Sequence, residues 1–216
     1  MKYDLVIFDL DGTTLNTLED LADACNHALA LNGFPTHDLE KIRTSVGSGV
    51  ARLIDLTVPD GTTPEIRAKV LAEFKAYYAS HVNVKTAPYP GITAMLCALK
   101  NAGIRVATNS NKFDAAVQAL SLAHFGDLVS MALGERSDIP KKPSPEGVYR
   151  IMNALSASKE RTLFVGDSNI DLLTAQNAGI DCAWVSWGFR SREELGDLDI
   201  PHVFDSAQEL AEFILS

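Results

Sequence analysis

Short apolar runs recur along the chain, and most are followed by turn residues and then by apolar residues at helical spacing. A continuous apolar run is typical of a strand buried on both faces, as in a parallel sheet between two helix layers. This alternation predicts an α/β fold with a doubly wound, Rossmann-like parallel sheet. The strand-sized runs are residues 5–8, 104–107, 128–131, 163–165 and 182–185.

Two helices of the predicted α/β fold have clear start and stop signals. Pro90-Gly91 precedes one of them, which ends near Asn101-Ala102-Gly103. The other follows Asp167 and ends at Gly179, because glycine directly after the last apolar residue commonly terminates a helix.

The stretch from residue 14 to about residue 86 contains no run typical of a buried strand. It indicates helices from Thr17 to Asn32-Gly33, over residues 50–56 and over residues 65–80. Loops between sheet elements usually have only about 2 to 6 residues, so this stretch indicates an inserted helical domain. We therefore predict a core domain of residues 1–14 and 87–216 and an all-α cap domain of residues 15–86.

Charge and composition exclude several kinds of partner. The chain has 19 Lys and Arg against 28 Asp and Glu, a net charge of −9, and a pI near 5.0. Nucleic acids and anionic membranes attract basic surfaces, so we expect neither as a partner. No apolar stretch is long enough for a membrane helix, and Asp9 and Asp11 interrupt the apolar start too early for a signal peptide.

Three widely spaced cysteines complete the compositional evidence. Cys25, Cys97 and Cys182 each have mainly apolar neighbours. This pattern predicts buried thiols in a reducing compartment, and hence a cytoplasmic protein.

The strongest chemical signal is a pair of acidic residues at the end of the first predicted strand. Side chains two residues apart on a strand point the same way, so Asp9 and Asp11 converge where parallel sheets bind ligands. Two neighbouring carboxylates are costly unless a proton or a cation lies between them. Gly12 permits a sharp turn and a close approach of the backbone to a ligand.

Further polar residues follow other predicted strands. If the strand before Asp167 neighbours the first strand, Asp167 joins Asp9 and Asp11 in a set of oxygen ligands that suits Mg²⁺. Thr108 and Asn109 can offer a hydroxyl and backbone N–H groups to phosphate oxygens, and Lys142 can supply a fixed cation.

The ordered set of these motifs resembles the haloacid dehalogenase superfamily of phosphohydrolases over essentially the whole chain. The matching elements are D-x-D-G-T at 9–13, a Thr/Ser strand end at 108, K-P at 142–143 and G-D-x-x-x-D at 166–171. The resemblance implies a parallel sheet with a helical cap inserted just after the first motif.

The resemblance also implies roles for individual residues. Asp9 resembles the nucleophile that forms an aspartyl phosphate, and Asp11 resembles the general acid and base. Mg²⁺ would be held by the Asp9 carboxylate, the Asp11 backbone carbonyl and Asp167, and Asp171 would order the surrounding shell. The resemblance further implies that the phosphoryl oxygens are bound by Thr108, Asn109 and Lys142.

A narrower resemblance points to phosphoglycolate phosphatases. It rests on residues 45–54, 74–78, 86–91 and 187–195. It implies that Ser48, flanked by Gly47 and Gly49, lies on a cap loop facing the nucleophile. The chain departs from the usual pattern in that Lys112 does not directly follow Thr108-Asn109.

We therefore predict a Mg²⁺-dependent phosphatase of small phosphorylated metabolites, with 2-phosphoglycolate as the best single substrate, acting as a monomer or homodimer. The acidic residue Asp11 argues for phosphoryl chemistry and against the dehalogenating branch of the superfamily. A hexose-phosphate mutase of the same superfamily is an alternative. A receiver-like signalling domain is another, but it has no helical insertion before its second strand. Some residues also have purely structural interpretations: Asp171 could complement a helix dipole, and Gly47 could simply form a turn.

Overall fold

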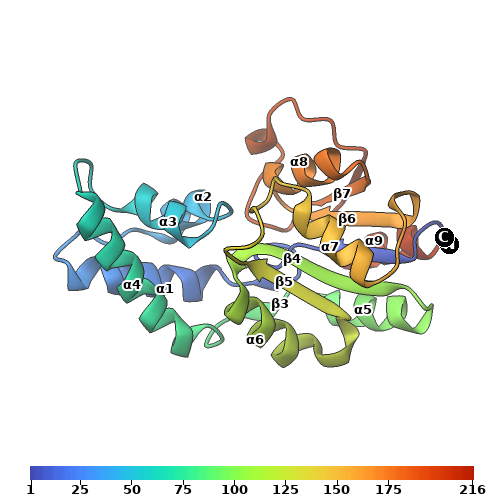
Figure 1. Cartoon of the computed structure of the whole chain (residues 1–216), viewed down its shortest axis with the longest axis horizontal. Helices are drawn as coiled ribbons and strands as arrows, with labels where there is room; N and C mark the ends of the chain where they lie inside the picture. The colour runs from blue at the N-terminus through green and yellow to red at the C-terminus, as the bar shows by residue number, and fades with distance from the viewer.

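The computed structural model describes residues 1–216, and its centre is a parallel sheet of six strands in the order β5-β4-β1-β6-β7-β8 (Figure 1). The strand order reverses at β1, because the chain runs from β1 out to β4 and β5 and then returns to β6 on the other side. Open α/β sheets bind ligands at the carboxyl ends of their strands near such a reversal. The strands are β1 (Leu5–Phe8), β4 (Arg105–Phe113), β5 (Met131–Glu135), β6 (Thr162–Gly166), β7 (Asp181–Val185) and β8 (His202–Phe204).

Helices cover both faces of this sheet. Val6 and Phe8 of β1 pack with α5, α6 and α9, whereas Leu5 and Ile7 pack with α7 and α8. Burial on both faces explains why the strands are continuous apolar runs, and it confirms the predicted α/β class. These helices are α5 (Ile92–Asn101), α6 (Asp114–Phe125), α7 (Glu146–Ala154), α8 (Asn169–Ala178) and α9 (Ala207–Leu215).

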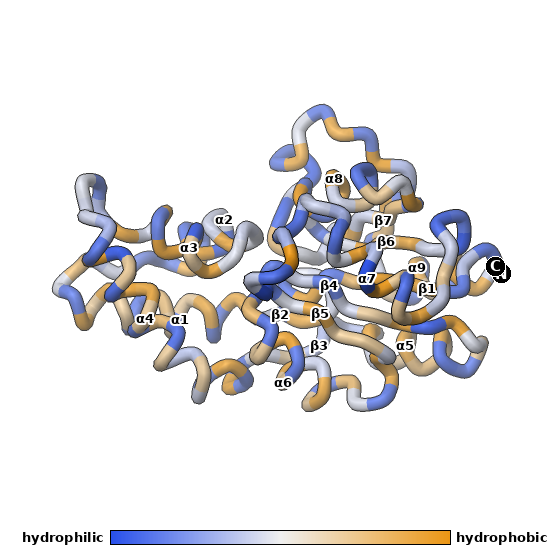
Figure 2. Tube along the Cα trace, in the orientation of Figure 1, coloured by the Kyte–Doolittle hydropathy of each residue, from blue (hydrophilic) through white to orange (hydrophobic).

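Four further helices follow β1 and lie together at one end of the molecule (Figure 1). Their buried residues, among them Leu29, Ile42 and Phe74, form a hydrophobic cluster of their own. Figure 2 shows the hydrophobic stretches along these helices and along the central strands. The helices are α1 (Leu18–Leu31), α2 (Leu39–Ser45), α3 (Val50–Thr57) and α4 (Pro64–His81).

A short antiparallel ribbon joins the helical insertion to the sheet. Its two strands are β2 (Leu15–Asn16) and β3 (Ala87–Pro88), so the chain leaves and re-enters the core side by side. We propose residues 15–86 as the cap domain and residues 1–14 and 87–216 as the core domain.

The structure corrects several element predictions. The predicted strand over 128–131 is misplaced, since Gly126–Leu128 is a 3₁₀ helix and β5 runs from Met131 to Glu135. The reason is that β5 contains Gly134, where a Cβ would lie 2.5 Å from Cα of Asp114, so packing and not hydrophobicity selects this residue. Helix α2 and strands β2 and β8 were not predicted, because these elements are short and partly exposed.

The cysteines are free, as expected, but only Cys25 and Cys182 are buried. Cys97 is exposed, because it lies on the outer side of α5 while Leu96 faces the sheet.

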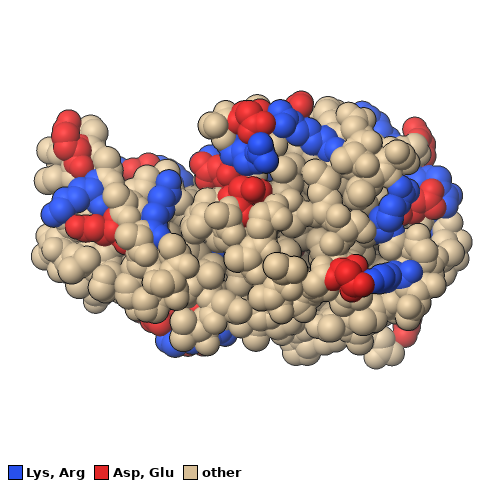
Figure 3. Space-filling model, turned by 60° about the horizontal axis from the view of Figure 1, so that its bottom comes forward, with Lys and Arg blue, Asp and Glu red and all other residues tan.

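Charged side chains are mixed on the surface. On the face shown in Figure 3, Lys and Arg lie next to Asp and Glu and form no continuous basic block. Ion pairs such as Lys100–Asp127 at 2.6 Å and Arg150–Asp138 at 2.9 Å show the same intermixing. None of the helices combines the length and the hydrophobicity that crossing a bilayer requires.

Candidate active site

Three carboxylates meet at the carboxyl ends of β1 and β6. Asp9 directly follows β1, Asp167 directly follows β6, and Asp171 lies in the first turn of α8. One oxygen from each of these three side chains lies within 4.8 Å of the other two. The parallel pairing of β1 with β6 brings the two sequence motifs together.

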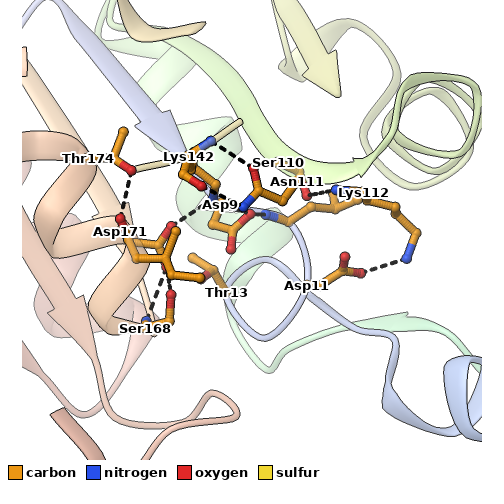
Figure 4. Close-up of polar contacts among 12 residues, drawn as sticks. Asp9, Asp11, Thr13, Ser110, Asn111, Lys112, Lys142, Ser168, Asp171 and Thr174 are labelled. Carbon is orange, nitrogen blue, oxygen red and sulfur yellow. Dashed lines mark hydrogen bonds and ion pairs between the residues drawn. The ribbon is translucent and has the colours of Figure 1, made fainter. Parts of the chain in front are cut away.

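A buried lysine joins two of these carboxylates (Figure 4). Nζ of Lys142 lies 2.9 Å from Oδ1 of Asp9 and 2.7 Å from Oδ1 of Asp171. Burial opposes the charge of Lys142, but the carboxylates of Asp171 and Asp9 outweigh it and raise the pKa of the ammonium group. Burial also raises the pKa of Asp9 well above its usual value, although Lys142 opposes that rise.

Asp171 has a structural and an electrostatic role at once. Its Oδ2 accepts hydrogen bonds from the backbone N–H of Ser168 at 3.1 Å and from the Ser168 hydroxyl at 2.6 Å, which forms a capping box at the start of α8. Its other oxygen binds Lys142. Asp171 therefore takes part both in the start of α8 and in the three-carboxylate group.

Asp167 is held by neighbours from two other segments. Its Oδ1 accepts a hydrogen bond from the Thr13 hydroxyl at 3.1 Å, and its Oδ2 accepts one from the Phe189 N–H at 2.6 Å. Burial, together with the charge of Asp171, raises the pKa of Asp167 to about 7. Gly12 has φ +85°, and a Cβ there would lie 2.5 Å from Oδ2 of Asp167, so only glycine fits.

Asp11 lies apart from the three-carboxylate group and has partners of its own. Its Oδ1 accepts hydrogen bonds from Nζ of Lys112 at 2.9 Å and from the Thr17 hydroxyl at 2.6 Å. Lys112 is buried, and the ring centre of Tyr78 lies 4.8 Å from its ammonium group. Two aspartates that are two residues apart therefore occupy different electrostatic environments.

The pocket that contains Asp9, Asp11 and Asp167 has a volume of about 550 Å³, including the open space at its mouth. The cap supplies mainly apolar and glycine residues, and the core supplies the charged residues. Of the two cap-loop residues named from the sequence, Gly47 is part of the wall, whereas Ser48 is exposed and not part of it. The lining residues are Asp9, Asp11, Leu21, Val46, Gly47, Gly49, Val50, Leu53, Ser110, Asn111, Lys112, Asp167, Ser168, Phe189 and Arg190.

The structure does not bring Thr108 and Asn109 into this wall. Asn109 instead packs against α7, where a Cβ on Gly147 would lie 2.8 Å from its Oδ1. The pairing of β4 with β5 is irregular between Asn109 and Phe113, and this irregular segment carries Ser110, Asn111 and Lys112 to the pocket.

A sequence signal for this shift was present. Ser110-Asn111-Lys112 repeats the Thr/Ser-Asn pattern two residues later, with lysine directly after asparagine. The apparent departure from the superfamily pattern at Lys112 disappears in this register.

Asn111 connects the cap loop to the segment that carries Lys142. Its Nδ2 donates to the carbonyl oxygen of Gly47 at 3.1 Å and to that of Lys142 at 3.0 Å. Its Oδ1 accepts the backbone N–H of Lys142 at 2.9 Å. The Asn111 amide therefore fixes the position from which Lys142 reaches Asp9.

The donor set fits a divalent cation with a preference for oxygen ligands. Asp9, Asp167 and Asp171 offer three carboxylates, and the one ammonium group beside them is that of Lys142. Carboxylate oxygens are hard ligands, which suit hard divalent cations better than softer transition metals.

Comparison with known proteins identifies the class of this site. A family model described as haloacid dehalogenase-like hydrolase matches residues 6–185, so the chain belongs to that family. Within it, the chain is phosphoglycolate phosphatase-like and a phosphoric monoester hydrolase, as the next comparisons show.

Similar proteins match over nearly their whole lengths. A phosphoglycolate phosphatase from Psychrobacter arcticus is 31% identical, with 100% of this chain and 97% of the relative covered. One from Rhodospirillum rubrum is 32% identical, with coverage of 97% and 90%. A crystal structure from Lactobacillus delbrueckii subsp. bulgaricus, assigned as a phosphoglycolate phosphatase, has a TM-score of 0.94 and 35% identity and covers 100% of both chains.

Proposed function

We propose that this chain is a Mg²⁺-dependent phosphatase that hydrolyses 2-phosphoglycolate through a phosphorylated Asp9. The substrate is suggested by the names of the similar proteins, and the chemistry by the site. The observation that carries the proposal is the position of Asp9. It lies at the end of the central strand, in the wall of the pocket and within the three-carboxylate group.

Asp9 and Asp11 divide the chemistry between them. A carboxylate oxygen of Asp9 attacks phosphorus and forms an aspartyl phosphate, while the bond from phosphorus to the glycolate oxygen breaks. Asp11 gives its proton to that leaving oxygen. Asp11 then takes a proton from water, whose oxygen attacks phosphorus, and the break of the bond to Asp9 releases inorganic phosphate.

The contacts of the two residues match these roles. Asp9 is fixed by Lys142 and by the N–H of Leu10 at 2.7 Å, which orients its carboxylate toward the pocket. Asp11 is held separately by Lys112 and Thr17. This separation keeps the proton carrier distinct from the nucleophile.

Asp9, Asp167 and Asp171 are the residues that would hold Mg²⁺. When bound, the cation supplies neutralisation of the charge on the phosphoryl group. Ser110 is in the pocket wall and can donate its hydroxyl to a phosphoryl oxygen, in the place predicted for Thr108. Lys142 holds a compensating positive charge directly beside Asp9.

The experiment measures phosphate release from 2-phosphoglycolate with and without chelator, and traps label on the protein from radiolabelled substrate. Asp9→Asn should lose at least about 10³-fold in kcat and carry no label. Asp11→Asn should be about 10²- to 10⁴-fold slower. Asp60→Asn, in an exposed turn of the cap, is the matched control and should retain wild-type activity.

Two results would contradict the proposal. Wild-type activity in Asp9→Asn would remove Asp9 as the nucleophile, and full activity in the presence of chelator would remove the metal. An isomer of a phosphorylated sugar with little free phosphate would instead indicate the mutase alternative.

We also propose a cytoplasmic enzyme, in keeping with three free cysteines and a net charge of −9. We propose that it acts as a monomer or homodimer, and sedimentation analysis distinguishes the two.

A further inference from the structure

Arg190 is the one residue of the pocket wall whose charge the proposed mechanism does not use. The wall contains two cationic side chains, Lys112 and Arg190. Lys112 is paired with Asp11 at 2.9 Å. The partners of the Arg190 guanidinium, in contrast, are all neutral carbonyl oxygens.

These carbonyl oxygens lie at the end of helix α2 in the cap. Arg190 donates to the carbonyl oxygen of Arg43 at 2.7 Å, to that of Thr44 at 3.3 Å and to that of Val46. Its Nη groups are therefore occupied, while its Nε–H has no hydrogen-bond partner. The contacts hold a half-buried guanidinium against the cap without cancelling its charge.

Arg43 makes the reciprocal contact but differs in charge balance. It donates to the carbonyl oxygen of Phe189, so each arginine binds the backbone segment that bears the other. Arg43 is also paired with Glu40 at 2.7 Å and with Glu194 at 2.9 Å, and it is not part of the pocket wall. The charge of Arg43 is therefore compensated by direct ion pairs, and Arg190 makes none.

At the phosphoryl end of the pocket, each lysine already forms ion pairs with aspartates. Lys142 lies between Asp9 and Asp171, and Lys112 binds Asp11. A substrate that carries a second anionic group beyond its phosphate therefore needs another cation in the wall. A guanidinium with a free N–H suits a carboxylate, because an ionised acceptor makes a stronger hydrogen bond than the neutral carbonyl oxygens that hold its Nη groups.

We propose that Arg190 binds a carboxylate of the substrate, so that the enzyme selects small phosphorylated carboxylic acids over uncharged phosphate esters. This inference rests on the proposed phosphatase function and specifies its substrate class. Gly47 and Arg190 are neighbours in the pocket wall: a Cβ on Gly47 would be in ordinary van der Waals contact with Nη2 of Arg190, at 3.7 Å.

The test compares two substrates that differ only in the second group. 2-Phosphoglycolate carries the carboxylate, and 2-hydroxyethyl phosphate carries a hydroxymethyl group in its place. The quantity measured is the ratio of their kcat/KM values in wild type, Arg190→Gln and Arg43→Gln. Loss of a charge-assisted contact should lower the ratio in Arg190→Gln by roughly 10- to 100-fold, mainly through KM for 2-phosphoglycolate.

Arg43→Gln is the matched control. It removes the other half of the reciprocal contact between cap and core and leaves the pocket charge in place. Both substrates should slow by the same factor in this variant, so the ratio should stay within about twofold of wild type. If kcat/KM also falls by the same factor for both substrates in Arg190→Gln, Arg190 serves only to attach the cap, and the inference is overturned.

The remaining outcomes also decide the question. An unchanged ratio in Arg190→Gln overturns the role of Arg190. If that variant does not fold, Arg190→Lys keeps a positive charge but has no donor at the position of the free Nε–H, so the ratio should again fall. A ratio equal to wild type in Arg190→Lys would overturn the inference. A wild type that hydrolyses both substrates equally well contradicts the selection only, whereas one that hydrolyses neither contradicts the proposed function itself.

Discussion

Lys112 donates a hydrogen bond of 2.9 Å to Oδ1 of Asp11, and both residues are part of the same pocket wall. Lys112 comes from the sheet, yet its ammonium group also lies against the ring of Tyr78 in α4 of the cap. Burial opposes the charge of Lys112, but the charge of Asp11 together with Tyr78 outweighs it and raises the pKa of the ammonium group. The group that orients Asp11 is thus a buried cation that the cap covers.

We expect Lys112→Met to reduce kcat about 10- to 100-fold, because Asp11 loses the charged partner that orients its carboxylate. The free energy of unfolding should fall by about 3 kcal/mol, as for other buried pairs that lose one member. Steady-state kinetics and urea denaturation measure the two effects. Lys141→Met is the control, since its pair with Glu135 is partly exposed and should contribute less than about 1 kcal/mol. Equal behaviour of the two variants would contradict the prediction.

The parts of the fold that sequence predicted are those with local signals. Leu5–Phe8 is an uninterrupted apolar run. Helix α8 begins with a capping box of Ser168 and Asp171 and ends at Gly179. Contacts between distant segments have no such signal. The hydrogen bonds from Arg190 to the cap join residues 144 to 147 positions apart, and nothing near Arg190 indicates them.

The error at Thr108 and Asn109 has a physical cause. Residues two apart on a regular strand point the same way, so Thr108 and Ser110 are equivalent in a periodic pattern. The irregular pairing after Asn109 distinguishes them, and sequence periodicity does not reveal where a strand departs from regularity.

Gly12 should tolerate no side chain, because a Cβ there would collide with Asp167. Gly33 separates this collision from the effect of a positive φ. Gly12→Ala and Gly33→Ala both place a side chain at positive φ, but a Cβ at Gly33 meets nothing within 4 Å. Gly33→Ala should therefore cost about 1 kcal/mol of unfolding free energy. Gly12→Ala should cost about 2 to 4 kcal/mol, because it also displaces the Asp167 carboxylate, and phosphate release should fall with it. Retention of full activity in Gly12→Ala would show that the position of Asp167 does not matter.

Asp20 should be critical for the junction between cap and core. This buried carboxylate accepts backbone N–H groups of Val84, Lys85 and Thr86 as well as the Thr86 hydroxyl. Asp20→Asn replaces one acceptor oxygen with a donor, so the free energy of unfolding should fall by about 2 to 3 kcal/mol. Asp23→Asn, one turn further along α1, removes only an exposed pair with Lys85 and should cost less than about 1 kcal/mol. Urea denaturation compares them, and equal losses would refute a special role for Asp20.

Asp181 should make the stability of the sheet depend on acid pH. Its burial would raise its pKa, but hydrogen bonds from Lys2 and Tyr3 outweigh burial and lower the pKa from 3.8 to about 2. The folded state therefore favours the ionised carboxyl more than the unfolded state does. The resulting stability is present above pH 3.8 and is lost as the pH falls toward 2.

Because solvent screens this partly exposed group, we expect Asp181→Asn to lose about 1 kcal/mol of unfolding free energy at pH 7. The difference from wild type should shrink as the pH falls through 2 and vanish only below it, where the carboxyl is protonated in both states. Urea denaturation at several pH values measures the curve. The double variant Lys2→Met/Asp181→Asn tests the cause, since the coupling energy between the two residues should be present at neutral pH and absent in acid. A coupling energy that does not change with pH would show that the ion pair is not the origin of the effect.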